Sequence, residues 1–121
     1  MRNPKRGDIY LVNFDPTQGA EIKKTRPALV LQTDIINSRD FNRTTIIAPF
    51  TSNIRQKQTR VAKILIPARS GNGLTQDSVV VSTQLRTADY TRFVKKLGKL
   101  TDKEMTQVDE SIGIVMGLKL L

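Results

Sequence analysis

The sequence contains no cysteine and no histidine. The absence of cysteine excludes disulfides, thiolate nucleophiles and the usual structural zinc sites. The absence of histidine excludes Ser-His-Asp hydrolases, zinc sites built on imidazole, and ribonucleases that pass a proton between two histidines. An enzyme with this composition must therefore work with Arg, Lys, Glu, Asp, Tyr and hydroxyl groups.

Aromatic residues and long apolar runs are also scarce. Tryptophan is absent, and there are four Phe and two Tyr, so a stacking platform for single strands is disfavoured. No apolar run approaches the roughly 20 residues that a spanning helix needs. The basic start, Met1 to Arg6, is followed by no apolar stretch typical of a signal peptide. We therefore expect a cytoplasmic protein with no membrane segment.

The length and composition predict one folded domain, residues 1–121. The chain is 121 residues long, with 38% apolar and 26% charged residues. This balance excludes wholesale disorder and a coiled coil, and no internal repeat or Pro/Ser-rich linker divides the sequence.

Positive charge is in excess and unevenly distributed. Twenty Lys and Arg face eleven Asp and Glu, which gives a net charge of +9. Residues 71–121 are nearly neutral, whereas residues 41–76 contain no acidic residue. The basic residues of that second stretch are Arg43, Arg55, Lys57, Arg60, Lys63 and Arg69. Such a surface is either an ordinary solvated face or a binding surface for nucleic acid or an acidic protein.

Short apolar runs between turn residues predict a protein made mainly of strands. The expected strands are residues 9–14, 28–32 (entered from Pro27), 44–50, 61–66, 79–82 and 93–100. Thr33 and Asp34 predict a short helical turn through Ile36.

The last element is predicted to be an amphipathic helix. Thr101 and Glu104 form a capping box at its start. Behind them, Met105, Val108, Ile112, Val115 and Met116 fall on one face at helical spacing. Gly113 weakens this helix by about 1 kcal/mol relative to Ala, and Gly117 is placed to end it. Several strands followed by one such helix predict a curled antiparallel sheet covered by a C-terminal helix.

Three polar segments at strand ends are candidates for function. They are the loop of residues 15–26, the end of the third strand at residues 49–53, and the insertion at residues 83–87. Taken singly, each is equally typical of ordinary loop chemistry: a solvated charge run, strand-end hydrogen bonding, or an Arg86 ion pair with Asp89 or a helix carboxylate.

Taken together, these segments resemble the MazF/PemK toxins of toxin–antitoxin systems. The resemblance runs through residues 6–10 (RGDIY), 15–31 (DPTQGAEIKKTRPALVL), 47–52 (IAPFTS), 84–87 (QLRT) and 97–100 (LGKL). These motifs occur in the family's order and span essentially the whole chain.

The resemblance implies a mainly β fold, an SH3-like small barrel of twisted antiparallel strands with a C-terminal helix. It also implies a homodimer that cleaves single-stranded RNA, often mRNA, without metal or cofactor. The family's catalytic arginine and threonine fall on Arg26 and Thr51, and its loop carboxylate falls on Glu21. RNA contacts are expected from Gly19, Lys23, Lys24, Ser52, Asn53, Thr83, Gln84 and Arg86. Many relatives have Glu at the position of Thr83, so base preference is expected to differ here.

The residue chemistry agrees with such a reaction. In RNA the 2′-hydroxyl can attack the adjacent phosphorus, which leaves a 2′,3′-cyclic phosphate and a 5′-hydroxyl. The protein must orient the backbone, stabilise charge on the phosphorane and manage two protons. Arg26 offers a planar donor fork for phosphate oxygens, and Thr51 can donate a further hydrogen bond. Either Glu21 or Arg26 could accept the proton, although guanidinium groups stay protonated in proteins.

Two other functions are compatible with parts of the sequence. One is a non-enzymatic toxin that poisons a protein such as DNA gyrase, as the CcdB relatives do, which would not need the Arg26–Thr51 pair. The other is a basic nucleic-acid-binding module, but no helix-turn-helix or RNP-like pattern is present. As partners, the resemblance implies a cognate acidic antitoxin and leaves open operator DNA for the toxin–antitoxin complex.

Overall fold

The computed structural model describes residues 3–21, 23–53 and 61–120. Within these ranges the chain forms seven strands and two α-helices. The strands are β1 (Asp8–Asn13), β2 (Thr25–Val30), β3 (Thr44–Thr51), β4 (Lys63–Ile66), β5 (Ser78–Val81), β6 (Arg86–Asp89) and β7 (Phe93–Lys99). The helices are α1 (Asp34–Asn37) and α2 (Asp102–Val115), and short 3-10 turns cover Ser82–Gln84 and Tyr90–Arg92.

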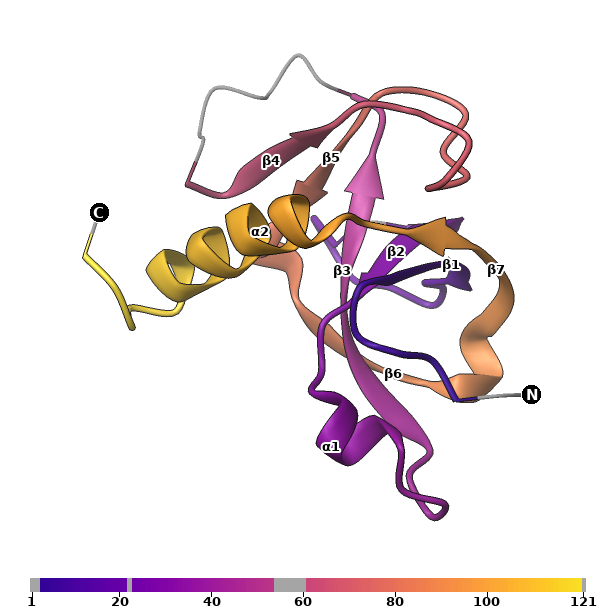
Figure 1. The fold of residues 1–121 in the computed structure, drawn as a ribbon. Helices are drawn as coiled ribbons and strands as arrows, with labels where there is room; N and C mark the ends of the chain where they lie inside the picture. Colours follow the sequence, from indigo (N-terminus) through magenta and orange to yellow (C-terminus); the bar gives the residue numbers. More distant parts are fainter. Residues whose placement is uncertain (1–2, 22, 54–60, 121) are drawn as a thin grey trace.

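All strand pairs of the described sheet are antiparallel, and β3 is its central member. The strand order is β4-β5-β3-β2-β1-β7, with β6 also paired to β3. The first half of β3 pairs with β6, its middle pairs with β2, and its last two residues pair with β5. Figure 1 shows β4 and β5 above, β6 and α1 below, and α2 running away from the strands. The predicted mainly β fold with a C-terminal helix is confirmed.

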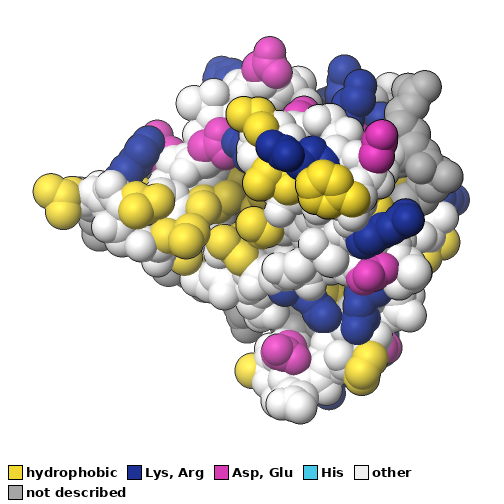
Figure 2. Space-filling model, turned by 90° about the horizontal axis from the view of Figure 1, so that it is seen from below, with side chains coloured by type: hydrophobic (Ala, Val, Ile, Leu, Met, Phe, Trp, Pro, Cys, Tyr) yellow, Lys and Arg dark blue, Asp and Glu magenta, His cyan; other side chains and the backbone are white. Residues whose placement is uncertain are grey.

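Helix α2 begins and ends where the sequence predicts. Thr101 and Glu104 form the complete capping box, and the chain turns at Gly117, whose φ is +76°. Val108 is buried on the inner face, but Met116, which we expected on that face, caps the helix and is 59% exposed. Hydrophobic side chains therefore remain visible over the α2 end of the lower face (Figure 2). None of the described helices has the length and apolar character to cross a membrane.

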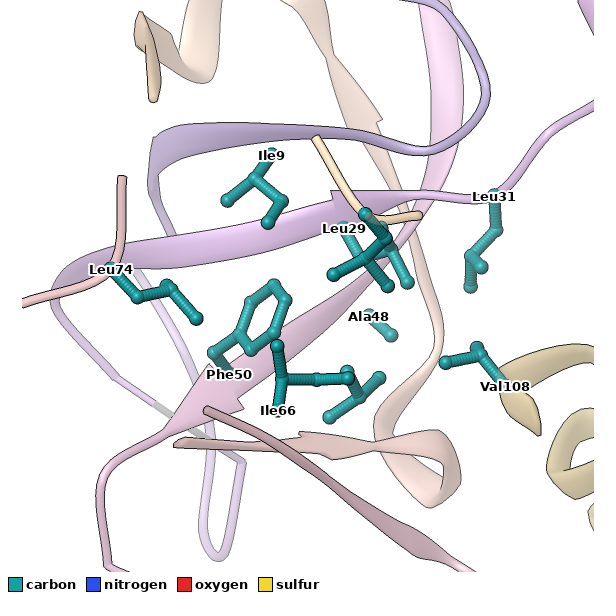
Figure 3. Close-up of a cluster of buried hydrophobic side chains, with 10 residues drawn as sticks. Ile9, Leu29, Leu31, Ala48, Phe50, Ile66, Leu74 and Val108 are labelled. Atoms are coloured by element: carbon teal, nitrogen blue, oxygen red, sulfur yellow. The ribbon is translucent and has the colours of Figure 1, made fainter. Parts of the chain in front are cut away.

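The core lies between the curled strands and α2. Side chains on one face of β2 and β3 join a cluster that includes Leu29, Ala48 and Phe50, and α2 closes it with Val108 (Figure 3). Side chains on the opposite face join a second cluster, which contains Phe14 and Ala28. Because successive side chains of a strand point to opposite faces, β2 and β3 contribute to both clusters. Buried hydrophobic side chains therefore pack on both faces of these two strands.

Most predicted strand bounds are correct to within three residues, and two differences have a physical reason. Strand β2 begins at Thr25 rather than Ala28, so Pro27 is its third residue. The β2–β3 ladder starts only at Ala28, so Pro27 is paired with β1 and not with β3. A proline, which has no N–H to donate, is tolerated at such a half-paired position. Strand β6 was not predicted, because its four residues are mostly polar and only Ala88 is buried.

Candidate active site

Arg26 and Thr51 lie on the neighbouring strands β2 and β3. Arg26 is the second residue of β2 and Thr51 the last of β3. The β2–β3 ladder ends at the pair Ala28–Pro49, two residues short of each side chain. Beyond it, Arg26 pairs with β1 and Thr51 pairs with β5. Both are half-buried, which suits groups that must hold a substrate and still be reached by it.

The loop between β1 and β2, residues 14–24, carries Glu21. Its stem is closed by the amide of Phe14, which donates to the Lys24 carbonyl at 3.0 Å, and by the amide of Lys24, which donates to Asp15 Oδ1 at 3.0 Å. Gly19 adopts a φ of +55° at the loop tip, a conformation that glycine accepts without strain. The Glu21 carboxylate accepts a 2.6 Å hydrogen bond from the Gln18 amide, so the carboxylate is held within its own loop.

A cavity of about 390 Å³ lies beside this loop and is lined by residues from two of the predicted segments, residues 15–26 and 83–87. It is lined by Phe14, Ala20, Glu21, Pro49, Thr83, Gln84, Leu85 and Arg86. Glu21 and the Thr83–Arg86 segment are thus brought together across more than 60 positions of sequence. Arg86 lies 5.6 Å above the centre of the Phe14 ring and donates to the Phe14 carbonyl at 3.1 Å. The ion pair with Asp89 or a helix carboxylate that the sequence left open is therefore replaced by contacts with Phe14.

A second, smaller cavity of about 240 Å³ lies beside Arg26. Its lining consists of Arg26, Pro27, Phe50, Ser52, Leu74, Thr75, Gln76 and Ser78. Ser52 thus lines the same cavity as Arg26, and the exposed Asn53 donates its amide to Thr51 Oγ1 at 3.2 Å. Sequence reasoning did not find Thr75, Gln76 or Phe14 as site residues. Thr75 and Gln76 lie in a turn-rich stretch that no motif distinguishes, and Phe14 has the pattern of an ordinary core residue.

Basic side chains surround the site, although not in one continuous row. Lys23 and Lys24 are exposed at the end of the loop, and Arg26 Nε donates to the Lys23 carbonyl at 3.0 Å. In the acid-free stretch of residues 41–76, Arg69 is paired with Glu104 of α2, and this contact holds the helix. Arg55, Lys57 and Arg60 lie outside the described residues. Among the described residues, no three acidic side chains gather closely enough to hold a metal ion.

Comparisons with known proteins identify the family. Residues 5–116 match the model of the family described as PemK-like, MazF-like toxin of type II toxin–antitoxin system. The chain is 39% identical to Endoribonuclease EndoA of Bacillus subtilis over 114 residues, which covers 94% of this chain and 95% of that protein.

Solved structures of similar proteins have the same fold as this chain. MazF from Deinococcus radiodurans superposes with a TM-score of 0.78 at 27% identity, covering 95% of this chain and 97% of that one. A MazE-MazF structure from the same organism superposes with a TM-score of 0.70 at 24% identity and covers 95% and 96% of the two chains. With nearly all of its length matched in both sequence and fold, the chain belongs to the family of PemK-like, MazF-like toxins of type II toxin–antitoxin systems.

Proposed function

We propose that this toxin is an endoribonuclease that cleaves single-stranded RNA, mRNA in the cell, through attack of the 2′-hydroxyl on the adjacent phosphorus. The observation that carries the proposal is the position of Arg26 and Thr51 on the neighbouring antiparallel strands β2 and β3, each two residues beyond the pair Ala28–Pro49. The similarity to proteins named endoribonucleases supports the same activity. The products are a 2′,3′-cyclic phosphate and a 5′-hydroxyl, and the place of action is the cytoplasm, where mRNA is found.

Arg26 and Thr51 bind the phosphate in this mechanism. The guanidinium fork donates two parallel hydrogen bonds to the non-bridging oxygens, and the Thr51 hydroxyl donates a third. The hydrogen bond to the Lys23 carbonyl uses only Nε, and the N–H groups on the two terminal nitrogens remain to bind the phosphate. Donors aimed at the developing charge lower the barrier most in a site from which water is excluded, and half-burial of both residues supports this role.

Glu21 is the proton acceptor in this proposal. Its carboxylate lines the larger cavity and is reached by substrate once it leaves the Gln18 amide. A carboxylate is a better acceptor than a guanidinium, which stays protonated. The other lining residues Thr83, Gln84 and Arg86, together with Gly19, Lys23, Lys24, Ser52 and Asn53, bind the RNA on either side of the scissile bond.

The test is cleavage of RNA in the presence of EDTA. Purified protein is incubated with total RNA and excess chelator, and the ends of the fragments are analysed chemically. We expect fragments with cyclic phosphates and 5′-hydroxyls, because the reaction uses the substrate's own nucleophile. Loss of cleavage on chelation, restored by Mg²⁺, would refute the mechanism. Intact RNA under all conditions, with growth arrest on expression, would instead support a toxin that poisons a protein target.

Two protein partners accompany the proposed activity. One is a cognate acidic antitoxin, as the MazE-MazF structure of the similar Deinococcus protein suggests. The other is a second copy of this chain, since the lining of a largely apolar hollow of about 380 Å³ includes Leu31, Ile46, Ile112 and Met116. Exposed apolar groups that gather in one place are typical of an interface.

A further inference from the structure

Two arginines from a distant segment bind three consecutive carbonyls at the start of the β1–β2 loop. Arg92 Nη1 donates to the carbonyls of Asn13 at 3.1 Å and of Asp15 at 2.6 Å. Arg86 Nη1 donates to the carbonyl between them, that of Phe14, at 3.1 Å. These contacts join residues 72 to 79 positions apart.

Both arginines are mounted on ordered elements. Arg86 begins β6, where its register opposite Ile47 of β3 fixes the backbone. Arg92 ends the 3-10 turn of Tyr90–Arg92, and Asp89 caps that turn by accepting from the Thr91 amide at 2.9 Å. Hydrogen bonds from Thr91, with weaker attraction from Arg43 and Arg92, hold the pKa of Asp89 below its usual value. The cap therefore stays ionised, and the turn presents Arg92 from a fixed position.

The chemistry of the guanidinium group suits this role. Each terminal nitrogen carries two N–H donors, so Arg92 Nη1 can serve two carbonyls at once, as the two distances indicate. Arg86 adds contact between its guanidinium plane and the Phe14 ring, an attraction typical of arginine over an aromatic face. Together these contacts fix three successive peptide units, which a single hydrogen bond could not do.

Holding Asp15 also holds the far end of the loop. The Asp15 carboxylate accepts from the Lys24 amide, and Lys24, with φ at +72°, accepts from Phe14 through its carbonyl. Both ends of the loop that carries Glu21 are therefore tied to the residues that the arginines hold. The next residue back, Lys23, supplies the carbonyl on which Arg26 rests.

We infer that Arg92, assisted by Arg86, is a positioning residue that holds the β1–β2 loop so that Glu21 reaches the RNA; this inference rests on the proposed RNA cleavage. Arg86, which the sequence predicts to contact RNA, would also help to hold the loop through its hydrogen bond to the Phe14 carbonyl. Arg92 touches no reacting atom and acts only through the loop.

The experiment compares Arg92→Ala with the wild type and with Lys95→Ala, which removes an exposed positive charge from the neighbouring strand. We expect kcat for a short RNA to fall about 10- to 100-fold in Arg92→Ala, since small misplacement of a catalytic group has that effect. The KM should stay close to that of Lys95→Ala. Equal kcat values in Arg92→Ala and Lys95→Ala would overturn the inference.

A double-mutant cycle separates positioning from general loss of structure. In a Glu21→Gln background, Arg92→Ala should lower kcat little further, because the group that it positions is already absent. An equal fractional loss with and without Glu21 would mean that Arg92 acts elsewhere. If Arg92→Ala fails to fold, Arg92→Gln, which keeps part of the side-chain stem, takes its place.

Hydrogen exchange tests the clamp without any cleavage assay. Amides of residues 15, 17–21, 23 and 24 should exchange faster in Arg92→Ala than in the wild type, while those of β3 are unchanged. Unchanged exchange in the loop would refute the clamp even if RNA is cleaved. A wild-type protein that cleaves no RNA would refute the proposed function, and the exchange result would still decide whether Arg92 holds the loop.

Discussion

Each proposed catalytic side chain already has a partner within its own neighbourhood. Glu21 accepts from the Gln18 amide, and Arg26 donates to the Lys23 carbonyl. Thr51 Oγ1 accepts from the Asn53 amide, which leaves its own proton available to donate. In the absence of substrate, backbone atoms thus hold the Glu21 carboxylate and the Nε of Arg26 in place.

Removal of either phosphate-binding group should abolish cleavage and spare the fold. We expect Arg26→Ala and Thr51→Ala each to lower the cleavage rate by ~10²–10³, because each removes one donor to the developing charge. Arg26→Lys should also fail substantially, since an ammonium cannot replace the bidentate fork. Initial rates on a defined RNA, with circular dichroism to confirm folding, provide the measurement. The matched control is Arg43→Ala, which removes an exposed arginine; wild-type rates in folded Arg26→Ala or Thr51→Ala would contradict the assignment.

For single residues, the sequence predicts which side chains belong to the candidate site better than it predicts the residues that lie beside them. Glu21, Thr83, Gln84 and Arg86 were all predicted, and they line one cavity. Phe14 and Gln76 were missed, because a buried aromatic and a loop amide each have an ordinary structural explanation. That Arg86 lies over Phe14 depends on how β6 pairs with β3, which the sequence pattern did not predict.

Among the elements, α2 is tied to the loop before β5 by the half-buried carboxylate of Glu104. Glu104 closes the capping box with Thr101 and accepts from Arg69 in the loop before β5, with Arg69 Nη1 to Glu104 Oε2 at 2.8 Å. The Arg69 hydrogen bonds, followed by those from Thr101, hold the pKa of Glu104 below its ordinary value of 4.5. A lowered pKa in the folded state stabilises the fold at pH values above the unfolded pKa.

That stabilisation should disappear in acid. We expect the free energy of unfolding of the wild type to exceed that of Glu104→Gln near neutral pH, and the difference to shrink from about pH 5 downward as Glu104 becomes protonated. Urea unfolding of both proteins across this range measures the difference. Glu110→Gln, which removes an exposed carboxyl from the same helix, is the control. A difference that stays constant or grows in acid would contradict the role of the Arg69 contact.

The elements that the sequence predicted are those with a strong local signal. The capping box and helical spacing of α2 are local, and so is the short apolar run of β1 between turn residues. Strand β6 has no such signal, because it exists only through pairing with β3. The bounds of β2 likewise depend on β1, which supports Pro27 where β3 does not yet pair.

For the whole molecule, the positive net charge leads us to expect that RNA and the antitoxin compete for binding. With a charge of +9, RNA and an acidic antitoxin are both attracted to the surface. We expect the antitoxin to fold on binding and to cover the Arg26–Thr51 site or hold the β1–β2 loop away from it. A 2′-O-methyl RNA that cannot be cleaved and the cognate antitoxin should then displace one another, and both should bind more weakly as salt increases.

Competition titrations at two salt concentrations check this expectation. Each ligand is titrated against the toxin with and without a saturating amount of the other, and the two dissociation constants are compared. Simultaneous binding with no mutual loss of affinity would exclude inhibition by occlusion. Affinities that do not change with salt would contradict the electrostatic origin of the competition.

Strand β3 pairs with three different strands along its length, and this affects the proposed phosphate site. Arg26 belongs to the ladder with β1, whereas Thr51 belongs to the ladder with β5, and β3 alone joins the two. The spacing between the two side chains therefore depends on how β3 passes from one ladder to the other. The proposed phosphate site thus rests on the path of this one strand as well as on the two side chains.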